Sequence, residues 1–157
     1  MRPISPNLWF TDNAEEARDF YLGIFPNSEH VSTSYYTEVG PGTPGTVVTT
    51  TFRLNGIEFT GINGGMAMEY TDAISLLIPC DDQAEVDYFW EKLTDGGQEV
   101  QCGWLKDRYG VSWQVVPVRL EEMMLDPDRT KVDRMVGVML QQVKLDLPAL
   151  EAAFNGD

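Results

Sequence analysis

The segment from Cys102 to Pro117, CGWLKDRYGVSWQVVP, holds the residues best suited to covalent chemistry. Lys106 and Arg108 follow Cys102 closely, and a cation near a thiol lowers its pKa and makes it a better nucleophile. No histidine or asparagine can be placed beside this cysteine, so a small buried hydrophobe in a strand is the competing interpretation. Cys102 is therefore the candidate catalytic residue, and the rest of any catalytic machinery is unknown.

Composition and charge narrow the classes of partner. The 157 residues include 25 acidic and 11 basic side chains, for a formal net charge of −14. A surface this acidic repels phosphate backbones and anionic headgroups, so we expect neither nucleic acid nor a membrane as partner. No apolar stretch suits a signal peptide or a membrane span. With Cys80 and Cys102 read as reduced thiols, the sequence predicts a cytoplasmic protein.

Two similar runs of elements must position these residues. Apolar alternation, helical spacing and the Asn55-Gly56 turn predict strand, helix, strand, strand, strand in the first half: 5–11, 14–25, 30–39, 47–54 and 57–62. Thr11 or Asp12 is the expected helix cap. The second half repeats the plan, with a strand at 73–79, a helix at 81–93, one or two strands within 98–105, and a strand at 111–117. An internal duplication explains both halves.

The chain changes to helical patterning from Arg119 onward. Apolar residues recur every three or four positions across 128–144, namely Val132, Met135, Val136, Met139 and Val143. This amphipathic tail would cover either its own domain or a second subunit. We therefore predict a single α+β domain, 1–157, with two β-α-β-β-β modules at about 3–70 and 71–118 and a helical tail at about 119–157.

The duplicated plan, with DRYGVSWQV in its last hairpin, resembles the vicinal oxygen chelate superfamily of glyoxalases, bleomycin-resistance proteins and extradiol dioxygenases. Four segments are similar to the PhnB-like family, whose members often carry the label 3-demethylubiquinone-9 3-methyltransferase domain: LWFTDNAEEARDFY, FTGINGG, ISLLIPCDDQAEVDYFWEKL and CGWLKDRYGVSWQVVP. The likeness extends over nearly the whole chain, including the tail. It implies half-barrel cups, commonly built in homodimers, that hold a ligand or a metal ion.

The metal-binding positions of the superfamily fall here on weak ligands. They correspond to Ser5, to Ala73 or Ser75, to Gln114, and to a residue within 61–63. Hydroxyls and amides offer a divalent cation only neutral dipoles in place of imidazoles and carboxylates. We expect no cofactor and no metal site, with a weakly held divalent metal as the disfavoured alternative. The one histidine, His30, lies in a polar stretch and is interpreted as a surface residue.

Strand parity selects the candidate ligand-binding residues of the cups. If alternate apolar residues pack under the helices, the opposite parity faces the cup. Gln114 would orient a polar ligand or serve equally well as a satisfied interior amide, and Asn63 is alternatively a turn residue before Gly64. The predicted ligand-binding set is Asn7, Trp9, Asn63, Ser75 and Gln114.

Three functions stay open at this point. The first is a metal-poor protein that binds a small neutral or cationic aromatic molecule, most simply as a homodimer. The second is a glyoxalase-like lyase, isomerase or dioxygenase that uses Cys102 or a weakly held metal. The third is a structural or regulatory protein whose acidic surface and tail bind another protein. Methyl transfer is disfavoured, because the sequence lacks a Gly-rich turn between a strand and a helix.

Overall fold

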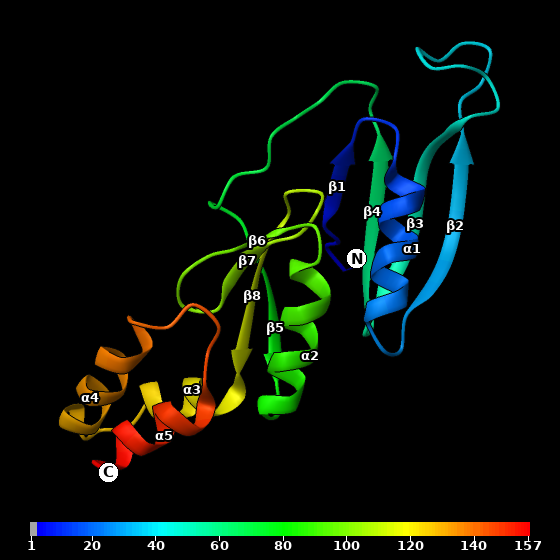
Figure 1. The fold of residues 1–157 in the computed structure, drawn as a ribbon. Helices are drawn as coiled ribbons and strands as arrows, with labels where there is room; N and C mark the ends of the chain where they lie inside the picture. Colours follow the sequence, from blue (N-terminus) through cyan, green and yellow to red (C-terminus); the bar gives the residue numbers. More distant parts are fainter. Residues whose placement is uncertain (1–2) are drawn as a thin grey trace. The chain divides into compact units, whose positions relative to one another are not determined.

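The computed structural model describes residues 3–157 (Figure 1). The chain separates into two compact units, Met1–Glu69 and Tyr70–Asp157. Each unit contains one four-stranded sheet, and three helices end the second unit. The predicted α+β fold with a repeated β-α-β-β-β plan and a helical tail is confirmed.

The first unit follows the order strand, helix, strand, strand, strand. Its elements are β1 (Asn7–Phe10), α1 (Ala14–Ile24), β2 (Glu29–Tyr35), β3 (Val47–Leu54) and β4 (Ile57–Asn63). The strands lie in the order β1-β4-β3-β2, with β1 parallel to β4 and the other neighbours antiparallel. Asn55 and Gly56 join β3 to β4 with φ values of 44° and 86°, the two positive φ angles of a type I′ turn.

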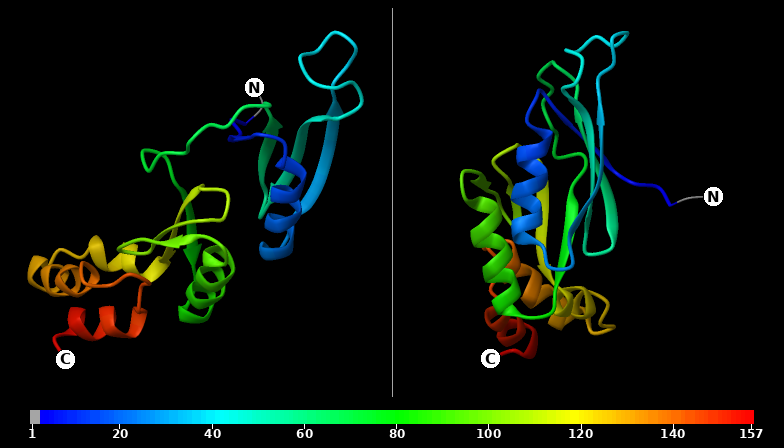
Figure 2. Two further views of the ribbon diagram at one scale, coloured as in Figure 1. Left: turned by 45° about the horizontal axis from the view of Figure 1, so that its top comes forward. Right: turned by 90° about the vertical axis from the view of Figure 1, so that its right-hand side faces the viewer.

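One face of this sheet packs against α1 (Figure 2). Leu8 and Phe10 of β1 are 6% and 4% exposed, and Tyr21 of α1 stacks on Phe52 of β3 with ring centroids 6.0 Å apart. Burying side chains of this size contributes roughly 1.5–3 kcal/mol each. The residues of opposite parity, Trp9 among them, therefore face away from the helix.

The second unit repeats the same topology. Its elements are β5 (Leu76–Cys80), α2 (Gln83–Thr94), β6 (Gln98–Glu99), β7 (Trp104–Lys106) and β8 (Ser112–Pro117). The strand order β5-β8-β7-β6 matches that of the first sheet, and β5 is parallel to β8. In each module, the first and last strands of the chain order thus pair in parallel at one edge of the sheet.

The turn between β7 and β8 is built around one carboxylate. Asp107 Oδ1 accepts hydrogen bonds from the backbone N–H groups of Tyr109 and Val111, at 2.9 and 3.0 Å. Its Oδ2 accepts from the indole N–H of Trp113 at 2.8 Å, and Gly110 has the positive φ expected there, 84°. The motif DRYGVSW is therefore structural, and Trp113 is a core residue, 3% exposed.

The tail forms three helices, α3 (Val118–Met124), α4 (Arg129–Met139) and α5 (Leu147–Asn155). Their apolar residues pack with the end of β8 into one cluster whose buried members are Val116, Leu120, Met123, Val132, Met135, Leu145, Leu150 and Phe154. The predicted helix at 128–144 is too long, because α4 ends at Met139 and Val143 belongs to the following loop. The predicted apolar stripe thus packs mainly within the tail itself.

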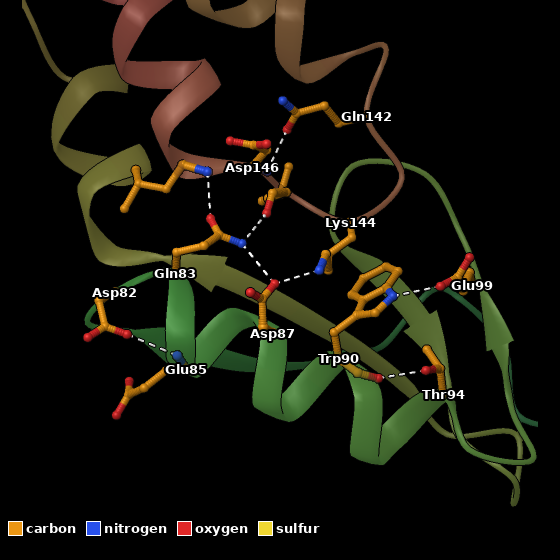
Figure 3. A network of polar contacts seen from close by, with 12 residues as sticks. Asp82, Gln83, Glu85, Asp87, Trp90, Thr94, Glu99, Gln142, Lys144 and Asp146 are labelled. Atoms are coloured by element: carbon orange, nitrogen blue, oxygen red, sulfur yellow. Dashed lines mark hydrogen bonds and ion pairs between the residues drawn. The ribbon is translucent and has the colours of Figure 1, made fainter.

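The tail is attached to α2 by polar contacts from its connecting loop (Figure 3). The Gln83 side chain donates to the Leu145 carbonyl at 3.1 Å and accepts from the Leu147 N–H at 2.7 Å. One turn further along α2, Asp87 forms an ion pair with Lys144 at 2.5 Å. These contacts fix the start of α5 against the N-terminal half of α2.

Candidate ligand-binding site

The face of the second sheet opposite α2, called the uncovered face because α2 does not cover it, carries the strongest candidate site. Leu105 and Trp113 are neighbours in the β7–β8 register, and both are buried on the face that packs against α2. Trp104 and Gln114, which alternate with them, are also register partners and are half-buried on the opposite face. An indole ring and an amide therefore lie side by side on a surface that α2 does not cover.

Gln114 and Ser75 are brought together on this face, as the strand parity indicated. Gln114 Nε2 donates to Ser75 Oγ at 2.8 Å, and Ser75 immediately precedes β5. Among residues 3–157, no hydrogen-bond donor reaches the Gln114 side-chain oxygen. This amide is fixed through its nitrogen and still offers an acceptor to a bound molecule.

A second polar cluster lies beside this pair. Asp72 accepts a hydrogen bond from Ser112 Oγ at 2.8 Å and forms an ion pair with Lys106 at 3.1 Å. Ser112 and Lys106 are partners in the β7–β8 register, so both lie on the face of Gln114. The hydrogen bonds from Ser112 and Lys106 hold the pKa of Asp72 below its usual value. The negative charge of Asp72 and the positive charge of Lys106 thus balance each other at the margin of the site.

Three residues of this site were missed by the sequence reasoning. Trp104 and Lys106 follow from the same alternation that selected Gln114, once the turn 107–110 sets the hairpin register. Asp72 lies in the segment that precedes β5, outside any regular element, and no sequence pattern marks it. Val116, two residues beyond Gln114, packs into the tail cluster, so the tail closes one end of this face.

Two of the predicted residues of the first unit, Asn7 and Trp9, lie on the face of its sheet that α1 does not cover, whereas Asn63 lies on the α1 side. Trp9 is the register partner of Ile62, and its indole N–H donates to the Met66 carbonyl at 2.8 Å. Asn7 is exposed, and its amide donates to the Ser5 carbonyl at 3.3 Å. Neighbouring hydroxyls on the same face bond to one another, including Ser34 with Thr49 at 2.6 Å. This face is a polar, hydroxyl-rich surface with one indole at its edge.

Asn63 is a structural residue of the first unit. It ends β4, is 7% exposed, and its side-chain oxygen accepts from the Ala14 N–H at 2.9 Å. Its amide nitrogen donates to the Val47 carbonyl at 3.1 Å. The expected caps of α1, Thr11 or Asp12, are wrong, because the N-cap is Asn13 and the capping oxygen comes from Asn63. The alternative of a left-handed turn residue is also wrong, since Asn63 lies in a strand.

Cys102 lies in a turn and not in a strand. It has a left-handed φ of 58°, and its thiol points to the Met139 carbonyl, 3.6 Å away. The two cations that motivated its assignment are engaged elsewhere, Lys106 with Asp72 and Arg108 with Asp95 at 2.5 Å. Neither cysteine forms a disulfide, and burial raises the pKa of the Cys80 thiol to about 12.

The metal-binding positions of the superfamily do not fit a divalent cation in this chain. Gln114 and Ser75 bond to each other, and both ends of the Asn63 amide are used within the fold. These positions offer neutral oxygens and nitrogens, which compensate poorly for the dehydration of a cation. Across residues 3–157, the structure shows no group of three or more His, Cys, Asp or Glu side chains able to hold a metal ion.

The repeated modules with their parallel first and last strands define a glyoxalase-like protein of the vicinal oxygen chelate superfamily. A family model described as 3-demethylubiquinone-9 3-methyltransferase matches residues 2–116, and the chain belongs to this PhnB-like family. The match ends before the tail, so the expectation that the likeness includes the tail is wrong. The comparison with curated proteins gave no match.

Solved structures agree with this assignment. A Bacillus cereus PhnB protein, described as a 3-demethylubiquinone-9 3-methyltransferase, is 40% identical, with 74% of this chain and all of that one covered and a TM-score of 0.67. A Pseudomonas aeruginosa protein of 18% identity has a TM-score of 0.61, covering 74% of this chain and 98% of its own. The Listeria monocytogenes fosfomycin resistance protein FosX, solved with Mn(II) and sulfate, is 19% identical. The match covers 78% of this chain and 94% of FosX, with a TM-score of 0.53. The last two show the fold alone.

None of the helices within residues 3–157 is long and apolar enough to cross a membrane.

Proposed function

We propose that this protein binds a small, planar, neutral organic molecule on the uncovered face of the second sheet, without a metal ion. The observation that carries the proposal is the pairing of Trp104 with Gln114 on that face. An indole provides a flat apolar wall, and an amide adds directional hydrogen bonding, which is the mixture that small-molecule sites use. The acceptor oxygen of Gln114 selects a ligand with an N–H or O–H donor.

Charge supports a neutral ligand over an ionic one at this face. Lys106 lies on this face, and Asp72 already balances its charge at 3.1 Å. A charged ligand would have to compete with this ion pair, whereas a neutral one leaves it intact. The side chains at the metal-binding positions of the superfamily, Gln114 and Ser75 among them, are also neutral. Binding of a neutral organic molecule there therefore needs no metal ion.

Methyl transfer is not the activity that this architecture favours. Enzymes that take the methyl group from S-adenosylmethionine commonly bind it at a Gly-rich turn between a strand and a helix of a doubly wound sheet. Here each sheet has four strands and is mixed, with a single parallel pair. The cations that favoured the enzymatic alternative through Cys102 are paired with Asp72 and Asp95, so we propose binding as the function. We further infer a homodimer, which light scattering of the purified protein would test, and a cytoplasmic location, which cell fractionation would test.

A screen of neutral bicyclic lactams tests the proposal, with 4-quinazolinone and its N-methylated form as a matched pair. We expect thermal stabilisation and saturable calorimetric binding by compounds that carry the N–H donor, and weaker binding by the methylated partner. Gln114→Leu should weaken binding by about tenfold, the value of one hydrogen bond at the site. Trp104→Ala should weaken it by a similar factor through lost ring contact.

Gln101→Leu is the matched control, because Gln101 is an exposed glutamine outside the site. The control should bind as the unchanged protein does. Absence of saturable binding across the screen, or equal affinities for Gln114→Leu and Gln101→Leu, would overturn the proposal. Stoichiometric binding of Mn²⁺ or Zn²⁺ by the metal-stripped protein, with loss on Gln114→Leu, would replace it with a metal-centred function.

A further inference from the structure

The first unit contains a pocket of about 710 Å³ whose lining residues all belong to that unit. It lies at the end of the first sheet, between the start of α1 and the loop that joins β2 to β3. Figure 1 shows this loop extending beyond the ends of both strands. The residues that decide its chemistry are Asp12, Glu15, Tyr35, Tyr36, Thr43 and Asn63.

The wall formed by the loop is built by specific contacts. The backbone of Tyr36 donates to the Thr46 carbonyl at 2.8 Å and accepts from the Gly45 N–H at 2.9 Å. The Tyr36 hydroxyl donates to the Asn63 carbonyl at 2.7 Å, which ties the loop to the end of β4. A Cβ at Gly42 would overlap the Tyr36 ring, so the loop needs glycine to lie against it. The wall is therefore a defined part of the fold.

The charges that line the pocket are all negative. Asp12 and Glu15 contribute carboxylates, and no lysine or arginine lines the pocket in the part of the chain that the structure describes. The N-terminus of α1 would favour an anion with about half a unit charge. The Ala14 N–H already donates to the Asn63 side chain. The two full negative charges of Asp12 and Glu15 therefore outweigh the remaining partial positive charge of the helix N-terminus. The field inside the pocket thus attracts cations.

The pocket suits an organic cation better than a metal ion. Calcium takes six to eight oxygen ligands and magnesium requires near-ideal octahedral geometry, whereas two separate carboxylates beside aromatic rings provide neither arrangement. Tyrosine faces and carboxylates together are the groups that hold ammonium and quaternary ammonium ligands. We propose that this pocket is a second ligand site, specific for a small organic ammonium cation.

Choline and its neutral carbon isostere 3,3-dimethyl-1-butanol are the probes that test this proposal. They have nearly the same shape and differ in the positive charge. We expect choline to bind saturably in calorimetry and to shift the backbone amide resonances of Thr43, Thr46 and Gly65. The isostere should bind about tenfold more weakly or not at all, because it loses both the carboxylate and the ring attraction.

Glu15→Gln should weaken choline binding by about three- to tenfold, since it removes one of two facing charges. Glu58→Gln is the matched control. Glu58 lies on β4 and does not line the pocket, and its substitution removes the same charge from the same unit. The affinity of the unchanged protein should also fall as NaCl is added, because the carboxylates are partly exposed.

Gly42→Ala gives a second test that does not alter charge. Crowding of Tyr36 should deform the wall and weaken choline binding, while amide resonances of the second unit stay in place. Equal binding of choline and its isostere, or equal affinities of Glu15→Gln and Glu58→Gln, would overturn the proposal. Stoichiometric Ca²⁺ binding that displaces choline would also overturn it. Gln114→Leu should leave choline binding unchanged, so this inference and the proposed function can fail separately.

Discussion

The side-chain oxygen of Asn63, at the end of β4, accepts a hydrogen bond from the backbone N–H of Ala14, 49 residues earlier in the chain, at 2.9 Å. This contact caps α1 from outside the helix, where a residue just before the helix would ordinarily do so. The same amide bonds to the Val47 carbonyl, so one buried side chain joins α1, β3 and β4.

Asn63→Ala should lower the free energy of unfolding by about 2 kcal/mol or more, because it leaves the Ala14 N–H and the Val47 carbonyl without their partner. Urea denaturation followed by circular dichroism measures this change. Asn7→Ala, at an exposed asparagine whose amide makes one long bond to Ser5, is the control and should change stability little. Equal stability of both variants would mean that the Asn63 contacts carry no net energy.

Gly64→Ala should destabilise the first unit by roughly 1–3 kcal/mol, the usual cost of overpacking. An added Cβ would overlap the indole ring of Trp9, which is held in place by its bond to Met66. Gly23→Ala is the control, since nothing lies within 4 Å of its Cβ position and it lies within α1. Alanine there should stabilise the protein by about 0.5–1 kcal/mol. A lower denaturation midpoint for Gly64→Ala and a higher one for Gly23→Ala are the expected results. A stabilised Gly64→Ala protein would contradict the overlap with Trp9.

Attachment of the tail to α2 should weaken at acid pH. The hydrogen bonds from Lys144 and then Gln83 lower the pKa of Asp87 from its ordinary value of 3.8. A lowered carboxyl pKa contributes stability above the ordinary value, and that contribution is lost as the pH falls through the folded pKa. The protection factor of the Leu147 N–H, which is bonded to Gln83, should therefore fall below about pH 4 once exchange is corrected for its intrinsic pH dependence.

Asp87→Asn removes the titrating group, so the protection factor of the Leu147 N–H should be lower at neutral pH and should no longer fall at acid pH. Asp133→Asn, on an exposed position of α4, is the control and should keep the wild-type profile. An unchanged profile in Asp87→Asn would show that the ion pair does not hold the tail.

The two cysteines should differ in their reaction with iodoacetamide. Cys80 is fully buried, and its pKa is raised to about 12, first of all by burial, so at pH 8 only about one thiol in ten thousand is ionised. Cys102 is only half-buried. Mass spectrometry should find labelling at Cys102 in the folded protein and at both residues in guanidinium. Rapid labelling of Cys80 in the folded protein would contradict its burial.

Much of the fold could be predicted because its determinants are local. Alternation and helical spacing located the strands and helices, and Asn55-Gly56 specified a hairpin turn through two positive φ angles. The last hairpin, predicted from the segment DRYGVSWQV, is likewise set by near neighbours, since Asp107 bonds to the Tyr109 N–H and Gly110 has a positive φ. Element ends were less accurate, as with α4, because helical propensity alone does not say where packing stops.

What the sequence determined by itself is therefore the repeated plan of elements, the parity of each strand and the acidic charge, all of which depend on near neighbours in the chain. The tertiary structure alone decided that Asn63 caps α1, that Asp72 pairs with Lys106, and that Gln83 holds the tail. Each of these contacts joins residues far apart in sequence. Hydrogen-bonding side chains accept many partners, so only the packed chain selects one of them.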